Sequence, residues 1–257
     1  MVFQTYVLVL RHPVNTGFVW FVFFSTICSY SFHWYLTEGA LVPSPRIRWI
    51  DRYRFVHLLL FLLGLAGAAI FFIYLADYWH WLLLAAFITF LYSAPKIPHP
   101  LFRSLRKIAY GKTIFLALVW MNVTTLLPVL IEEVSWRTDF TLFIISRFFM
   151  IYAICILFDY RDREGDKAAG IRSLITYLTE RGITNLFVFS LAVFTISTIT
   201  LYWFDYSVLN ITILLSPEII TAGLYKYAKR NFSDLFYYFV LDGLMAFSAL
   251  ITLIQAI

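Results

Sequence analysis

Charged residues are scarce in this sequence: Asp, Glu, Lys and Arg together make up 14% of its 257 residues, against about 25% in ordinary soluble domains. Disordered chains are rich in charge and poor in apolar residues, so this composition excludes them. Cysteine is also rare. Cys28 and Cys155 both lie inside apolar runs, which excludes a disulfide-rich secreted scaffold and indicates buried free thiols. No basic segment followed by a small-residue cleavage site stands at the start, so we expect no cleavable signal peptide.

Apolar residues dominate instead, since 61% of the chain is hydrophobic and 20% aromatic, and the mean hydropathy is +0.80. A soluble domain of this size has too little interior to bury so much apolar surface. A helix needs about 20 mostly apolar residues to cross a bilayer. We therefore expect an all-α, polytopic integral membrane protein with about eight transmembrane helices in a single domain over residues 1–257. The predicted spans lie near residues 14–36, 55–76, 78–94, 111–131, 140–158, 183–204, 208–225 and 235–257.

Basic residues alternate with these spans along the chain. The loops after the first, third, fifth and seventh spans hold 17 of the 20 Lys and Arg residues. The other loops are acidic, and Arg137 is their single basic residue. Because basic loops of membrane proteins face the cytoplasm, we expect these four loops there. The net charge of +5 is then a consequence of membrane topology and does not indicate a nucleic-acid partner.

The first ten residues are apolar but too short to cross a bilayer, and they end in a turn at Arg11-His12-Pro13. With eight spans and cytoplasmic basic loops, the N-terminus would lie outside. Two interpretations are open. The segment is either the end of a helix whose beginning is missing, or an interfacial or re-entrant segment.

The loop after the fifth predicted span carries the strongest chemical signal. Asp159, Asp162 and Asp166 are spaced i, i+3, i+7, and on a continuing helix this spacing puts three carboxylates on one face. Carboxylates so close together repel one another unless a cation lies between them. Oxygen-only ligands favour a hard ion such as Mg²⁺, which commonly bridges carboxylates to substrate phosphates. The alternative is a solvated loop of mixed charge held by local ion pairs.

Basic residues near these carboxylates are candidates for binding phosphate. Arg161 and Lys167 lie in the same segment, and the loop after the third span offers Lys96, Arg103 and Lys112. The preference for basic residues in cytoplasmic loops also accounts for such positions.

The segment around Asp162 resembles a motif of a known family. The pattern Arg161-Asp162-x-x-x-Asp166, followed by Ala-Ala-Gly-Ile-Arg-Ser-Leu at residues 168–174, is similar to the second aspartate-rich motif of the UbiA superfamily of membrane prenyltransferases. The most similar branch prenylates dihydroxynaphthoate in menaquinone synthesis and carries Asn where Asp159 stands. The resemblance extends from about His12 to the C-terminus. Further matches are residues 92–96 and Trp120, Thr124, Thr125 and Pro128.

This resemblance implies a nine-helix bundle around a central cavity, with two aspartate-rich motifs that hold Mg²⁺ and a prenyl diphosphate on the cytoplasmic side. The second motif would supply Asp159, Asp162 and Asp166 as metal ligands. The first motif should end the first predicted span, but its pattern of Asn and Asp is absent there, and only His33 and Glu38 remain as candidate ligands. The family has one helix more at its start, which favours a UbiA-like bundle that lacks its first helix.

The resemblance therefore implies an enzyme that transfers a prenyl group from a prenyl diphosphate to a hydrophobic acceptor, an aromatic compound or quinone precursor, within the membrane. Mg²⁺ and basic side chains would stabilise the pyrophosphate leaving group, and aromatic rings the carbocation. Because the first motif is missing, two alternatives stay open. One is a UbiA-like protein that binds isoprenoid lipids without catalysis, and the other is a membrane transporter or scaffold.

Three charged residues fall inside predicted spans, where charges are costly and usually functional: Arg147, Glu218 and Asp242. Arg147 lies 12 residues before Asp159, which is about 18 Å along a helix, too far to touch the metal motif. We expect Arg147 to form a buried ion pair with Asp242 or Glu218 that links two helices. The alternative is that it lines a polar substrate path.

Overall fold

The computed structural model describes residues 1–36, 45–94, 97, 99, 112–168, 170 and 173–256, and the regular structure in these ranges is helical throughout. The chain divides into two compact units. The smaller unit comprises Val14–Lys107, and the larger unit comprises Met1–Pro13 with Ile108–Ile257.

The smaller unit is built around a pair of long helices, α2 and α4. Asn15 begins α2 because its side chain accepts a hydrogen bond from the backbone N–H of Phe18 at 3.0 Å. The two helices approach closely at Gly64, where an added Cβ would lie 2.5 Å from the backbone nitrogen of Cys28. Only glycine permits this contact. The elements are α2 (Thr16–Tyr35), α3 (Pro45–Arg52), α4 (Arg54–Tyr74), η2 (Ala76–Tyr78) and α5 (Trp79–Ser93).

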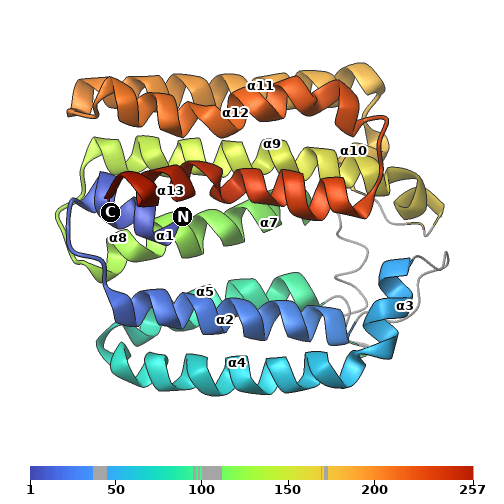
Figure 1. Cartoon of the computed structure of the whole chain (residues 1–257), viewed down its shortest axis with the longest axis horizontal. Coiled ribbons are helices and arrows are strands. Elements are labelled where there is room, and N and C mark those ends of the chain that lie inside the picture. Colours follow the sequence, from blue (N-terminus) through green and yellow to red (C-terminus); the bar gives the residue numbers. More distant parts are fainter. Residues whose placement is uncertain are drawn as a thin grey trace. The chain divides into compact units, whose positions relative to one another are not determined.

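The larger unit is organised around α9 (Thr138–Ala168), which contacts α7, α10, α11, α12 and α13. Figure 1 shows α9 between the α11–α12 pair and α7. Every residue from Met150 to Leu157 is buried, as expected for a helix that is apolar on all sides and surrounded by others. The remaining elements are α1 (Val2–Gln4), η1 (Thr5–Leu10), α7 (Lys112–Met121), η5 (Asn122–Leu126), α8 (Leu127–Ile131), α10 (Leu174–Tyr177), α11 (Glu180–Thr200), η6 (Leu201–Phe204), α12 (Val208–Ala228), η7 (Phe236–Leu241) and α13 (Asp242–Ala256).

Six helices are long and apolar enough to cross a membrane: Arg54–Tyr74, Thr113–Ile131, Thr138–Ala168, Glu180–Phe204, Val208–Ala228 and Phe236–Gln255. They support the prediction of an integral, multi-pass membrane protein. Each of the eight predicted spans coincides with a helix, but the count of eight is not confirmed. Helix α5 has 15 residues, fewer than the about 20 that a bilayer requires. Helix α2 is long enough, but Ser, Thr, Tyr and His lower its hydropathy.

Two prolines inside helices of the larger unit each leave a backbone carbonyl oxygen without its helical hydrogen bond, and a side chain donates to that oxygen instead. Pro128 has no N–H to donate to the carbonyl oxygen of Thr124 one turn earlier, and Oγ1 of Thr5 donates to that oxygen at 2.8 Å. At Pro217 the same role falls to Ser216, which donates to the carbonyl oxygen of Ile213 at 2.7 Å. The contact from Thr5 also anchors the N-terminal segment. This segment is helical over Val2–Leu10; that a longer helix precedes it stays a prediction.

Candidate functional site

Helix α9 continues without a break past its apolar stretch to Ala168, so Asp159, Asp162 and Asp166 are all helical. This is the condition under which the i, i+3, i+7 spacing puts three carboxylates on one face. Asp162 and Asp166 are one turn apart, and residues at this spacing are neighbours on a helix surface. Asp159 and Asp166 are about 10 Å apart along the axis. Asp162 and Asp166 are therefore the pair most readily bridged by one ion.

Asp159 faces the interior of the larger unit. It is 5% exposed, and the hydroxyl of Thr113 on α7 donates to its Oδ2. The contact joins α7 to α9 at the basic end of the unit. A buried carboxylate is costly unless it accepts hydrogen bonds, so this contact gives Asp159 a structural role in addition to its predicted role as a metal ligand.

Arg161 is held in a cage of aromatic rings. Its side chain is 7% exposed, and its guanidinium carbon lies 4.7 Å from the ring centre of Tyr237, 4.9 Å from that of Tyr238 and 5.4 Å from that of Phe158. Its Nε donates to Oδ1 of Asp162 at 2.8 Å. Its Nη2 donates to the hydroxyl of Tyr238 at 2.9 Å. Arg161 therefore orients Asp162 and supplies a fixed positive charge beside it.

The outer face of this helix end is accessible. The side chain of Asp162 is 43% exposed, and Asp166 is half-buried. Lys167, a predicted phosphate ligand, donates to Oε1 of Glu164 at 2.9 Å across one helical turn. Asp234, at the start of the last helical segment, lies 3.8 Å from Nη1 of Arg161. The carboxylates of Asp162 and Asp234 thus both lie beside the Arg161 guanidinium.

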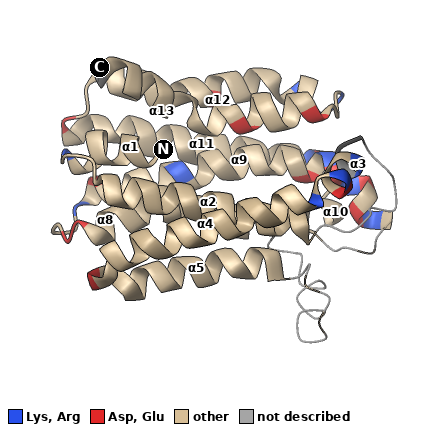
Figure 2. Cartoon of the chain, turned by 60° about the horizontal axis from the view of Figure 1, so that its bottom comes forward, with Lys and Arg blue, Asp and Glu red and all other residues tan. Residues whose placement is uncertain are grey.

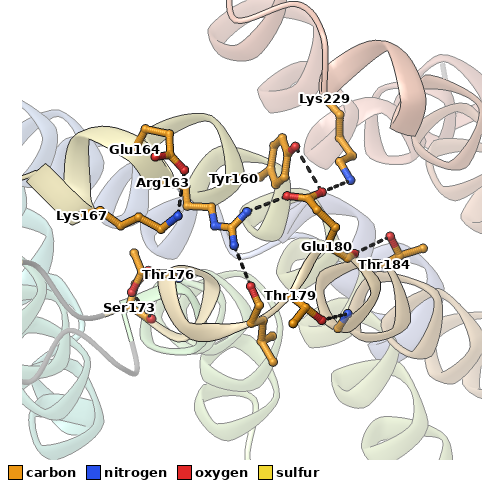
Figure 3. A network of polar contacts seen from close by, with 12 residues as sticks. Tyr160, Arg163, Glu164, Lys167, Ser173, Thr176, Thr179, Glu180, Thr184 and Lys229 are labelled. Atoms are coloured by element: carbon orange, nitrogen blue, oxygen red, sulfur yellow. Dashed lines mark hydrogen bonds and ion pairs between the residues drawn. The ribbon is translucent and has the colours of Figure 1, made fainter.

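A polar network that the sequence analysis missed fastens this end of α9 to its neighbours. Glu180, the first residue of α11, accepts hydrogen bonds from Arg163 at 2.6 Å and from Lys229 at 2.6 Å. Tyr160 donates to the same carboxylate at 3.3 Å. Arg163 also donates to the carbonyl oxygen of Leu178 at 2.7 Å. Figure 3 shows Glu180 at the centre, bound from α9 on one side and from the end of α12 on the other.

One signal for this network is present in the sequence. Glu180 is an acidic residue within the basic loops, directly after Thr179, whose side chain accepts from the backbone N–H of Gly182 and so begins α11. Figure 2 shows that charged residues of the larger unit gather mainly at the ends of its helices. An acid at such a basic end is expected to recruit cationic partners. Which basic side chains it contacts depends on how the helices pack against one another.

The contact between Lys229 and Glu180 makes stability depend on pH. Burial by itself would lower the pKa of Lys229, but the hydrogen bond to Glu180 and the nearby Tyr225 and Tyr160 outweigh it and raise this pKa. Because the pKa of Lys229 is higher in the folded state, the contact stabilises the fold at pH values below the pKa of the unfolded chain, about 10.4. This contribution is lost as the pH rises through the pKa of the folded protein. We expect Lys229→Met to lower the free energy of unfolding by about 0.5–1 kcal/mol at neutral pH. Unfolding in detergent at several pH values measures this, and the difference from wild type should shrink above about pH 10.4. A difference that persists unchanged there would contradict the ionic contribution.

The remaining predicted site residues lie elsewhere or outside the described residues. His33 is in the smaller unit, where its Nδ1 lies 3.2 Å from Oγ of Ser93 and its ring stacks on Tyr92 at 5.2 Å. Outside the described residues are Glu38, Lys96, Arg103 and the side chain of Lys112. Their roles stay predictions.

The predicted ion pair of Arg147 with Asp242 or Glu218 is wrong. Arg147 is 2% exposed, and its Nη2 donates to Oε1 of Gln4 at 2.6 Å, while Nη1 donates to Ser248 at 3.3 Å. Glu218 instead accepts from Thr195 at 2.6 Å. The N-terminal segment reaches this depth of the bundle and supplies a neutral partner, which the linear sequence does not reveal.

The chemistry of the donor set at the end of α9 suits Mg²⁺. Asp162 and Asp166 offer oxygen atoms only, they share one helical face, and Asp162 is accessible. In the part of the chain that the structure describes, no group of three or more His, Cys, Asp or Glu side chains is arranged to hold a metal ion. An ion held by two carboxylates would need waters and phosphate oxygens to complete its coordination, which is the usual arrangement for Mg²⁺.

Comparison with models of protein families, with curated proteins and with solved structures found no match. The site is therefore defined by its own geometry. It consists of an acidic helical face, a caged arginine and a network that holds both at the end of a long apolar helix.

Proposed function

We propose that this protein transfers a prenyl group from a prenyl diphosphate to a hydrophobic aromatic or quinone-precursor acceptor within the membrane, in the manner of the UbiA superfamily. The observation that carries the proposal is the continuation of α9 beyond its apolar stretch, with Asp162 and Asp166 on one face beside the buried Arg161. A diphosphate is charged and a prenyl chain is apolar. A site that binds both parts of the molecule is expected where an apolar membrane helix ends in charged residues.

Asp162 and Asp166 would hold Mg²⁺, with Asp159 one turn closer to the membrane. When bound, Mg²⁺ neutralises negative charge that develops on the diphosphate. Arg161 keeps Asp162 in place through the 2.8 Å hydrogen bond and adds positive charge at the same point. In the transfer, the allylic C–O bond breaks, pyrophosphate leaves with the electron pair, and a carbon of the acceptor forms the new bond and loses its proton. The alternation of basic loops supports a cytoplasmic location for this site.

A second candidate is a protein that binds isoprenoid diphosphates without transfer. It is favoured by the contacts in which the carboxylates already take part, Asp159 with Thr113 and Asp162 with Arg161. It is also favoured by the missing first motif, because removing a charge-stabilising partner costs about 10²–10³ in rate.

The test uses the full chain purified in detergent. Geranylgeranyl diphosphate is titrated calorimetrically with Mg²⁺ and with EDTA, and pyrophosphate release is then measured with dihydroxynaphthoate as acceptor. The proposal expects binding that requires Mg²⁺, followed by release of pyrophosphate and a prenylated product. Binding without release would support the second candidate, and no binding in either condition would contradict both.

A further inference from the structure

At the acidic end of the larger unit, opposite the candidate site, lies a cavity that the proposed function does not use. Its volume is about 300 Å³, at the lower end of the roughly 300–1,000 Å³ typical of ligand pockets. It lies where three separate parts of the chain meet: the turn after η1, the start of α9 and the connection from η6 to α12. The lining residues are Arg11, Arg137, Asp139, Trp203, Phe204 and Asp205.

Two arginines at this cavity stand where the charge pattern disfavours them. Of the basic residues in the larger unit, Arg11 and Arg137 lie at the acidic end, away from the basic loops. Arg137 is neutralised by Asp139, which accepts from its Nε at 2.9 Å and its Nη2 at 2.5 Å. Arg11 is not neutralised in this way. Its Nη2 donates to the backbone carbonyl oxygens of Phe204 and Asp205 at 3.1 and 3.3 Å, and no ion pair joins it to a carboxylate among the described residues.

The carboxylate of Asp205 is the counterpart of Arg11. Asp205 is exposed, and its side chain takes part in no ion pair among the residues that the structure describes. One cavity is therefore lined by a cation and an anion that form no ion pair with each other, next to the ion pair of Arg137 and Asp139. This arrangement is complementary to a ligand that carries one negative and one positive group a few bonds apart.

Aromatic residues place this cavity at the level of lipid head groups. Trp203 is 73% exposed and Tyr202 is 57% exposed, and both lie at the end of the membrane-spanning helix Glu180–Phe204. Exposed Trp and Tyr at the ends of spans sit at the interface between lipid and water. The ligand that reaches a cavity in this position most readily is a phospholipid of the surrounding bilayer.

We propose that the cavity binds the zwitterionic phosphoethanolamine head group of a membrane phospholipid, with its phosphate on Arg11 and its ammonium on Asp205. A guanidinium group binds phosphate through charge-assisted hydrogen bonds. The ammonium of ethanolamine carries N–H donors for a carboxylate, whereas the quaternary nitrogen of choline carries none. The site therefore selects phosphatidylethanolamine over phosphatidylcholine, and Asp205 disfavours anionic phosphatidylglycerol. This inference is independent of prenyl transfer.

The test measures lipid binding to the full chain in detergent by native mass spectrometry, with phosphatidylethanolamine, phosphatidylcholine and phosphatidylglycerol of identical acyl chains. Phosphatidylethanolamine is expected to bind about tenfold more tightly than the other two. Asp205→Asn should remove this preference, and Arg11→Gln should weaken binding of all three lipids about tenfold. Arg230→Gln, an exposed arginine after the other end of α12, is the matched control and should change nothing.

Because Arg11 also anchors the connection after η6, Arg11→Gln could alter the fold locally. Asp205→Asn keeps all backbone contacts of that connection, so it tests the head-group preference separately. Unchanged preference in Asp205→Asn, or tightest binding of phosphatidylglycerol by the wild type, would overturn the proposal.

Discussion

The double substitution Asp162→Asn with Asp166→Asn is expected to weaken Mg²⁺-dependent binding of geranylgeranyl diphosphate by at least about 100-fold. The two carboxylates lie on one face of α9 one turn apart, and their amides would keep the shape but lose the charge that holds the cation. The measurement is isothermal titration of the full chain in detergent at fixed Mg²⁺. Thermal stability should change little, because Asp162 is 43% exposed.

Asp234→Asn is the matched control for this experiment. Asp234 also lies near Arg161, at 3.8 Å, and its side chain is 47% exposed, but it does not belong to the acidic face of α9. Binding should stay within about twofold of wild type in this variant. Equal losses in Asp234→Asn and in the double variant would show that general negative charge, and not a metal site on α9, supports binding.

Replacing Gln4 by Leu is expected to lower the free energy of unfolding by about 1.5–3 kcal/mol. Gln4 accepts the 2.6 Å hydrogen bond of the buried Arg147 guanidinium and donates from Nε2 to Thr252 at 2.8 Å. Without the acceptor, a charged group at membrane depth loses a partner that water cannot replace. Equilibrium unfolding in mixed detergent and dodecyl sulfate micelles measures the change.

The double variant Gln4→Leu with Arg147→Met isolates this interaction. Removing both partners leaves no unsatisfied charge, so much of the lost stability should return. Gln4→Glu retains an acceptor for Arg147 and should stay close to wild type or exceed it. Wild-type stability in Gln4→Leu would mean that Arg147 does not depend on the N-terminal segment.

Much of the fold could be predicted because it depends on local properties of the chain. The apolar runs coincide with helices, and the longest of these helices, α9, continues to Ala168. The predicted count of eight membrane spans is not confirmed: six helices are long and apolar enough to cross a membrane, and α5 has only 15 residues. Of the candidate site, the sequence predicted only the residues that follow one another along the chain. Asp162 and Asp166 lie one turn apart on α9. Tyr237 and Tyr238, which pack around Arg161, belong to a segment more than 70 residues further along the chain.

The amino-acid sequence by itself determined that this is a helical membrane protein, which loops carry the basic charge, and that three aspartates follow one another along a helical face. Composition and periodicity set these features, and both are properties of short stretches of chain. Only the tertiary structure decided the partners of the charged groups: Gln4 for Arg147, Glu180 for Arg163 and Lys229, and the shared cavity of Arg11 and Asp205. Such partners are chosen by how helices rotate and pack against one another, because a buried charge must be satisfied by whichever group the packing brings within reach.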